Sequence, residues 1–106
     1  MIKKIELLEI TESSQPFMSA GKFIDLAASG YVENEYLFSG TANIYGEDGT
    51  GKAKVLYGDA PYTNRFIVRH PKNADKASGR ILVEIVNSTS FMDHDRIWLL
   101  TYKHLM

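Results

Sequence analysis

The glycine-rich stretch GEDGTGKA, residues 46–53, has a spacing close to that of a phosphate-binding loop. Such a loop needs a Ser or Thr after its Gly-Lys, because that hydroxyl holds Mg²⁺, and it connects a strand to a helix. Here Ala53 stands in place of the hydroxyl residue, and Glu47 and Asp48 would repel phosphate. The KAKVLYG run that follows alternates as a strand does. We therefore predict the tip of a β-hairpin and no nucleotide site.

Metal-ligating residue types occur together in Asp93, His94 and Asp95. Three adjacent residues at the start of a helix point in different directions, and no second His/Asp pair has ligand spacing. We expect Asp93 and Asp95 to favour the positive end of a helix dipole, and we predict no metal and no cofactor. His70 and His104 fall at the ends of predicted elements, where we expect them to be solvated.

No catalytic nucleophile is recognisable in the 106 residues. The serine of an α/β-type hydrolase lies in a G-x-S-x-G turn, and no serine in this chain has glycines at both of those positions. No two carboxylates stand out as a glycosidase pair. The aromatic residues leave two readings open, core or cross-strand pairs on one side and a ligand-binding platform on the other. They are Tyr31, Tyr36, Phe38, Tyr45, Tyr57 and Tyr62.

Composition indicates one soluble globular domain or a piece of one, with 44% hydrophobic and 24% charged residues. A net charge of −1 argues against nucleic acid as a partner, because phosphate neutralisation needs an excess of Lys and Arg. The absence of cysteine excludes disulfides and thiolate metal sites. Glu6 and Glu9 interrupt the apolar N-terminus, and no run approaches the ~20 apolar residues of a membrane span. We predict a cytoplasmic protein without a membrane partner.

Periodicity and turn residues predict a β-rich chain with one helix at its C-terminal end. In order, the predicted elements are a strand over 2–10, a short helix over 20–29 ended by Gly30, one or two strands over 31–46 with Gly40 as a candidate bulge, a strand over 52–58, a turn over 59–62, a strand over 63–71, a strand over 80–87 and a helix over 92–106.

The RILVEIVN segment, residues 80–87, is the most apolar predicted strand. A near-continuous apolar run is typical of a strand that is buried on both faces, so Glu84 needs a partner there. Ser90 and Asp93 have the spacing of a capping box for the following helix, whose predicted apolar face includes Ile97 and Leu100. A strand, a loop and a helix form an incomplete βαβ unit, because a second parallel strand should follow.

Three stretches, taken in order, resemble the N-terminal region of a family of α/β-hydrolase-domain proteins of the serine-esterase type. They are GYVENEYLFSGTANIYG (30–46), DAPYTNRFIVRHP (59–71) and GRILVEIVNSTSFMDHDRIWLL (79–100). The resemblance extends over about residues 25–106. It implies an α+β, β-rich fold of antiparallel hairpins plus one C-terminal helix, equivalent to the N-terminal part of an α/β-hydrolase sheet.

The resemblance also implies a role for the loop after RILVEIVN, the third strand of such a sheet. In α/β hydrolases this loop supplies one backbone N–H of the oxyanion hole. The loop residues here are Asn87, Ser88, Thr89 and Ser90. Family members often carry Gly in this loop and an aromatic residue before Asn87, where this chain has Val86. The nucleophile, the acid and the catalytic histidine would all lie beyond Met106, so no catalytic residue is assigned.

Two hypotheses about function follow. In the first, residues 1–106 are the N-terminal fragment of a longer carboxylic-ester hydrolase, inactive alone, with the remainder of that polypeptide as its partner. As an isolated fragment it would form homo-oligomers or exchange segments, because the 80–87 strand lacks neighbours. In the second, residues 1–106 are a self-contained β-rich module that binds a ligand or a protein.

Overall fold

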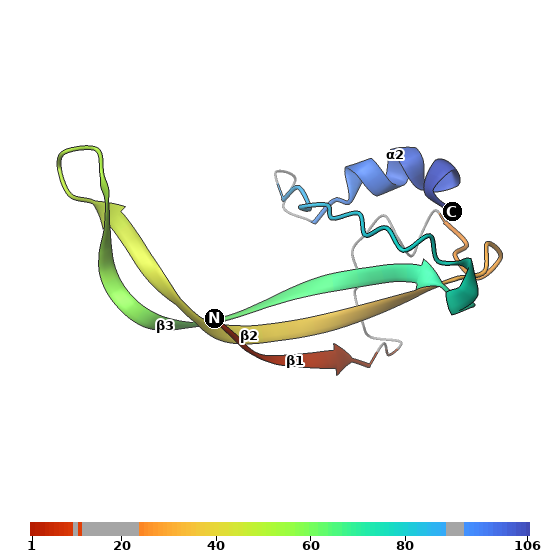
Figure 1. Cartoon of the computed structure of the whole chain (residues 1–106), viewed down its shortest axis with the longest axis horizontal. Coiled ribbons are helices and arrows are strands. Elements are labelled where there is room, and N and C mark those ends of the chain that lie inside the picture. The colour runs from red at the N-terminus through yellow and green to blue at the C-terminus, as the bar shows by residue number, and fades with distance from the viewer. Residues whose placement is uncertain (10, 12–23, 89–92) are drawn as a thin grey trace. The chain divides into compact units, whose positions relative to one another are not determined.

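A computed structural model describes residues 1–9, 11, 24–88 and 93–106. Three antiparallel strands form one sheet with the order β1-β2-β3, and one α-helix lies at the C-terminal end of the chain (Figure 1). The prediction of a β-rich chain with a C-terminal helix is therefore confirmed. The elements are β1 (Ile2–Leu8), β2 (Tyr31–Glu47), β3 (Ala53–Pro71), the 3-10 helix η1 (Ala74–Lys76) and α2 (Arg96–Leu105).

The chain divides into two compact units. The first contains residues 1–9 and 35–67, which include β1 and the central and distal parts of the β2–β3 hairpin. The second contains residues 10–34 and 68–106, which include the base of that hairpin, η1 and α2.

In the first unit, β1 pairs antiparallel with β2, and Ile5 lies opposite Phe38. The register shifts between Ile2 and Lys4, which lie opposite Gly40 and Ser39. The predicted irregularity at Gly40 is thus present, but the additional residue lies in β1. A Cβ on Gly40 would lie 2.1 Å from the carbonyl oxygen of Met1, so this close approach of β1 requires glycine.

Four aromatic rings on β2 and β3 pack against one another in the first unit. Tyr36 stacks on Phe66 with ring centroids 5.2 Å apart, and Phe38 meets Phe66 edge-to-face at 5.7 Å. Phe38 also meets Tyr62 edge-to-face at 6.0 Å. These residues therefore take the cross-strand role that was one of the two readings of the aromatic pattern.

The GEDGTG segment forms the tip of the hairpin, as predicted (Figure 1). Gly49 and Gly51 have φ values of 85° and 82°, which non-glycine residues rarely adopt. The Asp48 side chain organises the tip, because its Oδ1 accepts hydrogen bonds from the Thr50 hydroxyl at 2.6 Å and the Thr50 N–H at 2.8 Å. Residues after Lys52 continue as strand β3, so the helix that a phosphate-binding loop needs does not occur here.

The turn predicted at residues 59–62 is wrong, because β3 runs without interruption from Ala53 to Pro71. The backbone of β3 is nevertheless irregular at this place, since Asp59 has a positive φ of 53°. Its Oδ1 accepts a hydrogen bond from the Thr41 hydroxyl at 3.3 Å. Pro61 is compatible with this strand because β3 lies at the edge of the sheet, where one row of N–H groups needs no partner strand.

In the second unit, residues 26–30 form a turn and not the predicted short helix. The N–H groups of Ser29 and Gly30 donate to carbonyl oxygens three residues earlier, and Gly30 ends the turn with a φ of 72°. Ile24 in this unit is buried. Residues 20–23 of the predicted helix lie outside the described residues.

The strand predicted over residues 80–87 is not formed, and the expectation of burial on both faces is wrong. Ile81 is 91% exposed, Val83 82% and Ile85 92%. A strand requires a neighbouring strand for its N–H and C=O groups. Apart from the isolated bridge at Asn87, residues 80–87 join no ladder within the described part of the chain. The segment is apolar as predicted, but no described strand pairs with it.

Helix α2 is confirmed at Arg96–Leu105 and carries Lys103 and His104 in its last turn, as predicted. Its N-cap is Asp95, whose side chain makes no capping hydrogen bond. Ser90 of the predicted capping box lies outside the described residues. The predicted apolar face of α2 is largely exposed to solvent, with Leu100 82% exposed. None of the described helices has the length and apolar character needed to cross a membrane.

The hairpin tip yields a prediction about pH. Hydrogen bonds from Thr50, first from its hydroxyl and then from its N–H, lower the pKa of the Asp48 carboxyl. A lowered folded-state pKa means that the stabilisation is present above the unfolded pKa of about 4 and is lost as the pH falls through the folded value. We expect amide exchange at Thr50 to accelerate as the solution is acidified below about pH 4.

The measurement is amide hydrogen exchange by NMR as a function of pH, corrected for intrinsic exchange rates. In the matched variant Asp48→Asn, protection at Thr50 should be weaker and independent of pH in this range. Equal protection in both proteins at every pH would show that the carboxylate does not organise the tip.

Candidate functional site

The loop that begins at Asn87 is closed at its base by a pair of backbone hydrogen bonds. The Asn87 N–H donates to the His94 carbonyl at 2.9 Å, and the His94 N–H donates to the Asn87 carbonyl at 2.8 Å. Ser88 is exposed just inside this closure. The predicted loop residues Thr89 and Ser90 lie outside the described residues. The structure therefore defines both stems of the loop that was predicted to carry an oxyanion-hole donor.

The first stem is fastened to α2 by Glu84. Its Oε1 accepts a hydrogen bond from the Ile97 N–H at 2.7 Å, and its Oε2 accepts one from the Trp98 N–H at 3.0 Å. These two N–H groups belong to the first turn of the helix, which has no intrahelical acceptors for them and is the positive end of the helix dipole. We expected a polar partner for Glu84, and that partner is the N-terminus of α2.

The second stem is fastened to the base of the β2–β3 hairpin by Arg69. Its Nε lies 2.7 Å from Glu33 Oε2, and its Nη2 lies 2.5 Å from Asp95 Oδ2. The side chains of Arg69 and Asp95 are 7% and 4% exposed, so both charges are almost fully removed from solvent. The Arg69 guanidinium also lies over the ring of Trp98, 4.7 Å from its centroid, in a cation–π contact.

These contacts assign structural roles to two members of the Asp-His-Asp sequence. Asp95 neutralises Arg69, and His94 closes the loop through its backbone. Across the described ranges, no three His, Asp or Glu side chains converge in an arrangement that could hold a metal ion. Both His70 and His104 are exposed, as expected.

Sequence reasoning missed the cluster of Glu33, Arg69, Asp95 and Trp98. A signal for it was nevertheless present, because Glu33 and Glu35 are two residues apart on one strand, whereas Arg65 and Arg69 are four apart on the next. Even spacings place side chains on one face of a strand. Each acid does pair with one of these bases, since Arg65 Nη1 lies 3.0 Å from Glu35 Oε1. The ion pair between Asp95 and Arg69 could not be predicted from the spacing of residues in the sequence.

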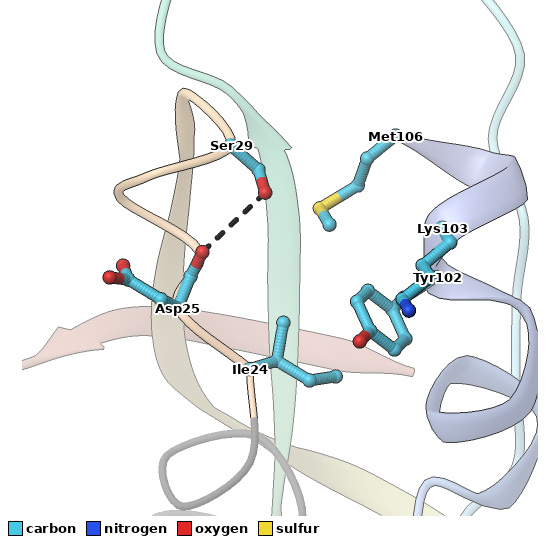
Figure 2. A pocket seen from close by; sticks show the side chains of 6 residues that line it. All are labelled: Ile24, Asp25, Ser29, Tyr102, Lys103 and Met106. Atoms are coloured by element: carbon cyan, nitrogen blue, oxygen red, sulfur yellow. Dashed lines mark hydrogen bonds between the residues drawn. The ribbon is translucent and has the colours of Figure 1, made fainter.

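A separate pocket of the second unit lies between the turn that follows Ile24 and the C-terminal end of α2 (Figure 2). Its lining residues are Ile24, Asp25, Ser29, Tyr102, Lys103 and Met106. The Ser29 hydroxyl donates to the Asp25 carbonyl at 3.5 Å, and Asp25 Oδ1 accepts from the Ala28 N–H at 2.9 Å. None of the described lining residues is a histidine, so the pocket holds no Ser–His pair.

Loss of Arg69 should be the most destabilising single change in this cluster. Arg69→Ala would leave Glu33 and Asp95 buried without a counter-charge, which typically costs about 3–5 kcal/mol. Because Trp98 is the single tryptophan of the chain and contacts Arg69, its fluorescence reports this unit directly. We expect the urea midpoint followed by Trp98 fluorescence to fall sharply. The control Lys4→Ala removes an exposed ion pair with Glu6 and should cost about 0–1 kcal/mol. Equal shifts in the two variants would contradict a central role for Arg69.

Loss of the Glu84 carboxylate should act on the start of the helix. Glu84→Ala removes the acceptor of two N–H groups, and a lost helix cap typically costs about 0.5–2 kcal/mol. We expect faster amide exchange at Ile97 and Trp98 and lower helicity by circular dichroism. Glu84→Gln keeps an acceptor without the charge and should lie between the two. Unchanged protection at Ile97 in Glu84→Ala would show that the cap is dispensable.

Comparison with known proteins gives one family match. The sequence profile of the alpha/beta hydrolase domain matches residues 6–106, which is nearly the whole chain. No similar protein was found among the curated proteins, and none was found among the solved structures. Since the profile match covers the end of β1, the hairpin, the loop stems and α2, the chain belongs to the alpha/beta hydrolase domain family.

Proposed function

We propose that this chain is the N-terminal part of a carboxylic-ester hydrolase and that it contributes one oxyanion-hole donor to a catalytic site completed by further polypeptide. The family match over residues 6–106 is the observation that carries the proposal. Two features support it: the absence of a G-x-S-x-G serine in the 106 residues, and the exposure of an apolar run that has strand periodicity.

The donor comes from the loop after Asn87 in this proposal. The Asn87 N–H is engaged by the His94 carbonyl, which leaves the N–H groups of Ser88, Thr89 and Ser90 as candidates. A backbone N–H is suited to this role because it is a fixed dipole that needs no reorganisation when negative charge develops on the substrate oxygen. Contacts at Glu84, Asn87 and Asp95 hold the two stems of this loop.

The polypeptide that follows residue 106 would supply the nucleophile, its histidine base and the acid. It would also supply strands that flank residues 81–85. The 106-residue chain is therefore catalytically incomplete in this proposal.

The proposal is tested by comparing the 106-residue chain with the longer polypeptide encoded by its gene. We expect the longer protein to hydrolyse p-nitrophenyl acetate and to be labelled by a fluorophosphonate, which reacts with activated serines, and the 106-residue chain to do neither. Ester hydrolysis by the 106-residue chain itself, with a labelled serine, would overturn the proposal. So would a longer protein that is inert towards both reagents.

The donor is located by a proline series in the longer protein. Proline lacks an N–H, so one of Ser88→Pro, Thr89→Pro and Ser90→Pro should lower kcat by about 10²–10³. Alanine at the same position keeps the N–H and is the matched control, with kcat close to that of the parent protein. If no proline variant loses more activity than its alanine counterpart, the donor lies elsewhere.

The exposed aromatic residues near the hairpin tip support a second candidate, a module that binds a ligand or a protein. Tyr45 and Tyr57 are 60% and 68% exposed and are not members of the aromatic cluster formed by the other strand residues. Binding at this place would be detected as a shift of their resonances, and it would require no catalytic activity from the longer protein.

A further inference from the structure

The tip of the β2–β3 hairpin contains Asp48 and Gly49, both exposed, which form the single Asp-Gly pair of the sequence (Figure 1). The backbone nitrogen of a following residue can attack an aspartyl side chain and close a five-membered succinimide ring. Glycine favours this attack because it has no Cβ to shield its nitrogen. The Gly49 N–H donates no hydrogen bond within the described part of the chain, so its nitrogen is not engaged elsewhere there.

Three donors of the tip hold the carboxylate that would be attacked. Asp48 Oδ1 accepts hydrogen bonds from the Thr50 hydroxyl at 2.6 Å, the Thr50 N–H at 2.8 Å and the Lys52 N–H at 3.4 Å. Hydrogen bonds to the ionised form favour that form, and the Thr50 hydroxyl is the largest cause of the lowered pKa of this carboxyl. Ring closure requires the neutral acid, because an ionised carboxylate is a poor electrophile. The tip therefore disfavours the reactive form of its own Asp-Gly pair.

We propose that Asp48 and Gly49 are a site of spontaneous isoaspartate formation, and that the Thr50 hydroxyl slows this reaction by holding the Asp48 carboxylate. The Gly49 nitrogen forms a bond to Asp48 Cγ, the bond between Cγ and the carboxyl OH breaks, and this OH leaves as water with the Gly49 amide proton. Water then adds to one of the two ring carbonyls. Hydrolysis at Cγ regenerates aspartate, whereas hydrolysis at the backbone carbonyl of residue 48 leaves the chain connected through Cγ.

The isoaspartyl product changes the hairpin tip in two ways. The main chain at residue 48 becomes one carbon longer, and its free carboxylate is attached directly to Cα, so the hydrogen bonds from Thr50 to Oδ1 are lost. Gly49 and Gly51 have φ values of 85° and 82° in the turn that joins β2 to β3, and an additional main-chain carbon alters this turn. The inference rests on the tip alone and does not depend on the proposed function.

Incubation of the folded chain at neutral pH for several weeks tests the site. An isoaspartyl carboxyl methyltransferase with labelled S-adenosylmethionine measures isoaspartate, and mass spectrometry of the tryptic peptide that ends at Lys52 locates it. We expect isoaspartate at residue 48, preceded by a succinimide that is lighter by one water. Asp48→Glu is the matched control, because it keeps the carboxylate but would have to close a six-membered ring, and it should stay unmodified. Absence of isoaspartate at residue 48 from both the parent chain and Thr50→Val would overturn the proposal.

The role of Thr50 is tested by two variants that differ in one hydroxyl. Thr50→Val removes the hydroxyl and keeps the N–H, whereas Thr50→Ser keeps both. The neutral fraction of a carboxyl changes about tenfold for each pKa unit, so we expect Thr50→Val to accumulate isoaspartate at least about threefold faster than Thr50→Ser. Amide exchange in β2 and β3 should be the same in both variants.

Peptides of residues 44–54 that carry the same two substitutions are the control for local sequence effects. In urea, where the hairpin tip is not formed, the two peptides should form isoaspartate at equal rates. Equal rates in the two folded variants, or the same difference in the two peptides, would overturn the role of Thr50.

Discussion

The second unit depends on a single buried guanidinium. Arg69 brings together the base of β2 through Glu33, the N-terminus of α2 through Asp95, and the ring of Trp98. Removing these charges from water is costly, and the attraction between them repays that cost only where the geometry is close. The 2.7 Å contact with Glu33 is a hydrogen bond, whereas Arg69 Nη2 and both carboxylate oxygens of Asp95 form no hydrogen bond among the described residues, so the 2.5 Å contact with Asp95 is an ion pair alone. Such a cluster contributes little net stability over an apolar core, but it accepts few alternative arrangements, so it fixes where α2 begins.

The position of α2 is in turn linked to the two described stems of the loop. Asp95 is the N-cap residue, His94 precedes it and is bonded to Asn87, and Glu84 accepts hydrogen bonds from the first turn of the helix. A carboxylate at a helix N-terminus is favoured by the dipole and by the N–H groups that lack intrahelical partners. The loop stems are therefore held by backbone and charged groups, whose directionality sets distances more strictly than apolar packing does. The proposed function needs stems of this kind, because a backbone donor acts on a reacting carbonyl only from a fixed position.

Much of this could be read from the sequence, and the failures have physical causes. The hairpin tip was predictable because glycines with positive φ and an Asp that accepts local hydrogen bonds are determined within a few residues. The C-terminal helix was predictable because helical periodicity is likewise determined by residues that are close together in the sequence. The prediction of a turn at residues 59–62 failed because the turn tendency of Pro61 is weaker than the pairing of β3 with β2. An edge strand can keep that pairing although proline lacks an N–H group. The prediction of a strand over residues 80–87 failed because a strand forms only between two segments, and the sequence of one segment carries no information about its partner. The Arg69 cluster was missed because Asp95 joins it through tertiary structure alone.

The distribution of polarity in the described residues explains why we expect another segment to cover the side chains of residues 81–85. Charged side chains such as Asp95 are buried there, whereas Ile81, Val83 and Ile85 face solvent. Full burial of one such aliphatic side chain is worth about 1.5–3 kcal/mol, so covering the segment adds a large fraction of a small domain's stability. Under the proposed function, a flanking strand of the following polypeptide would cover these side chains, and its high effective concentration would favour that pairing.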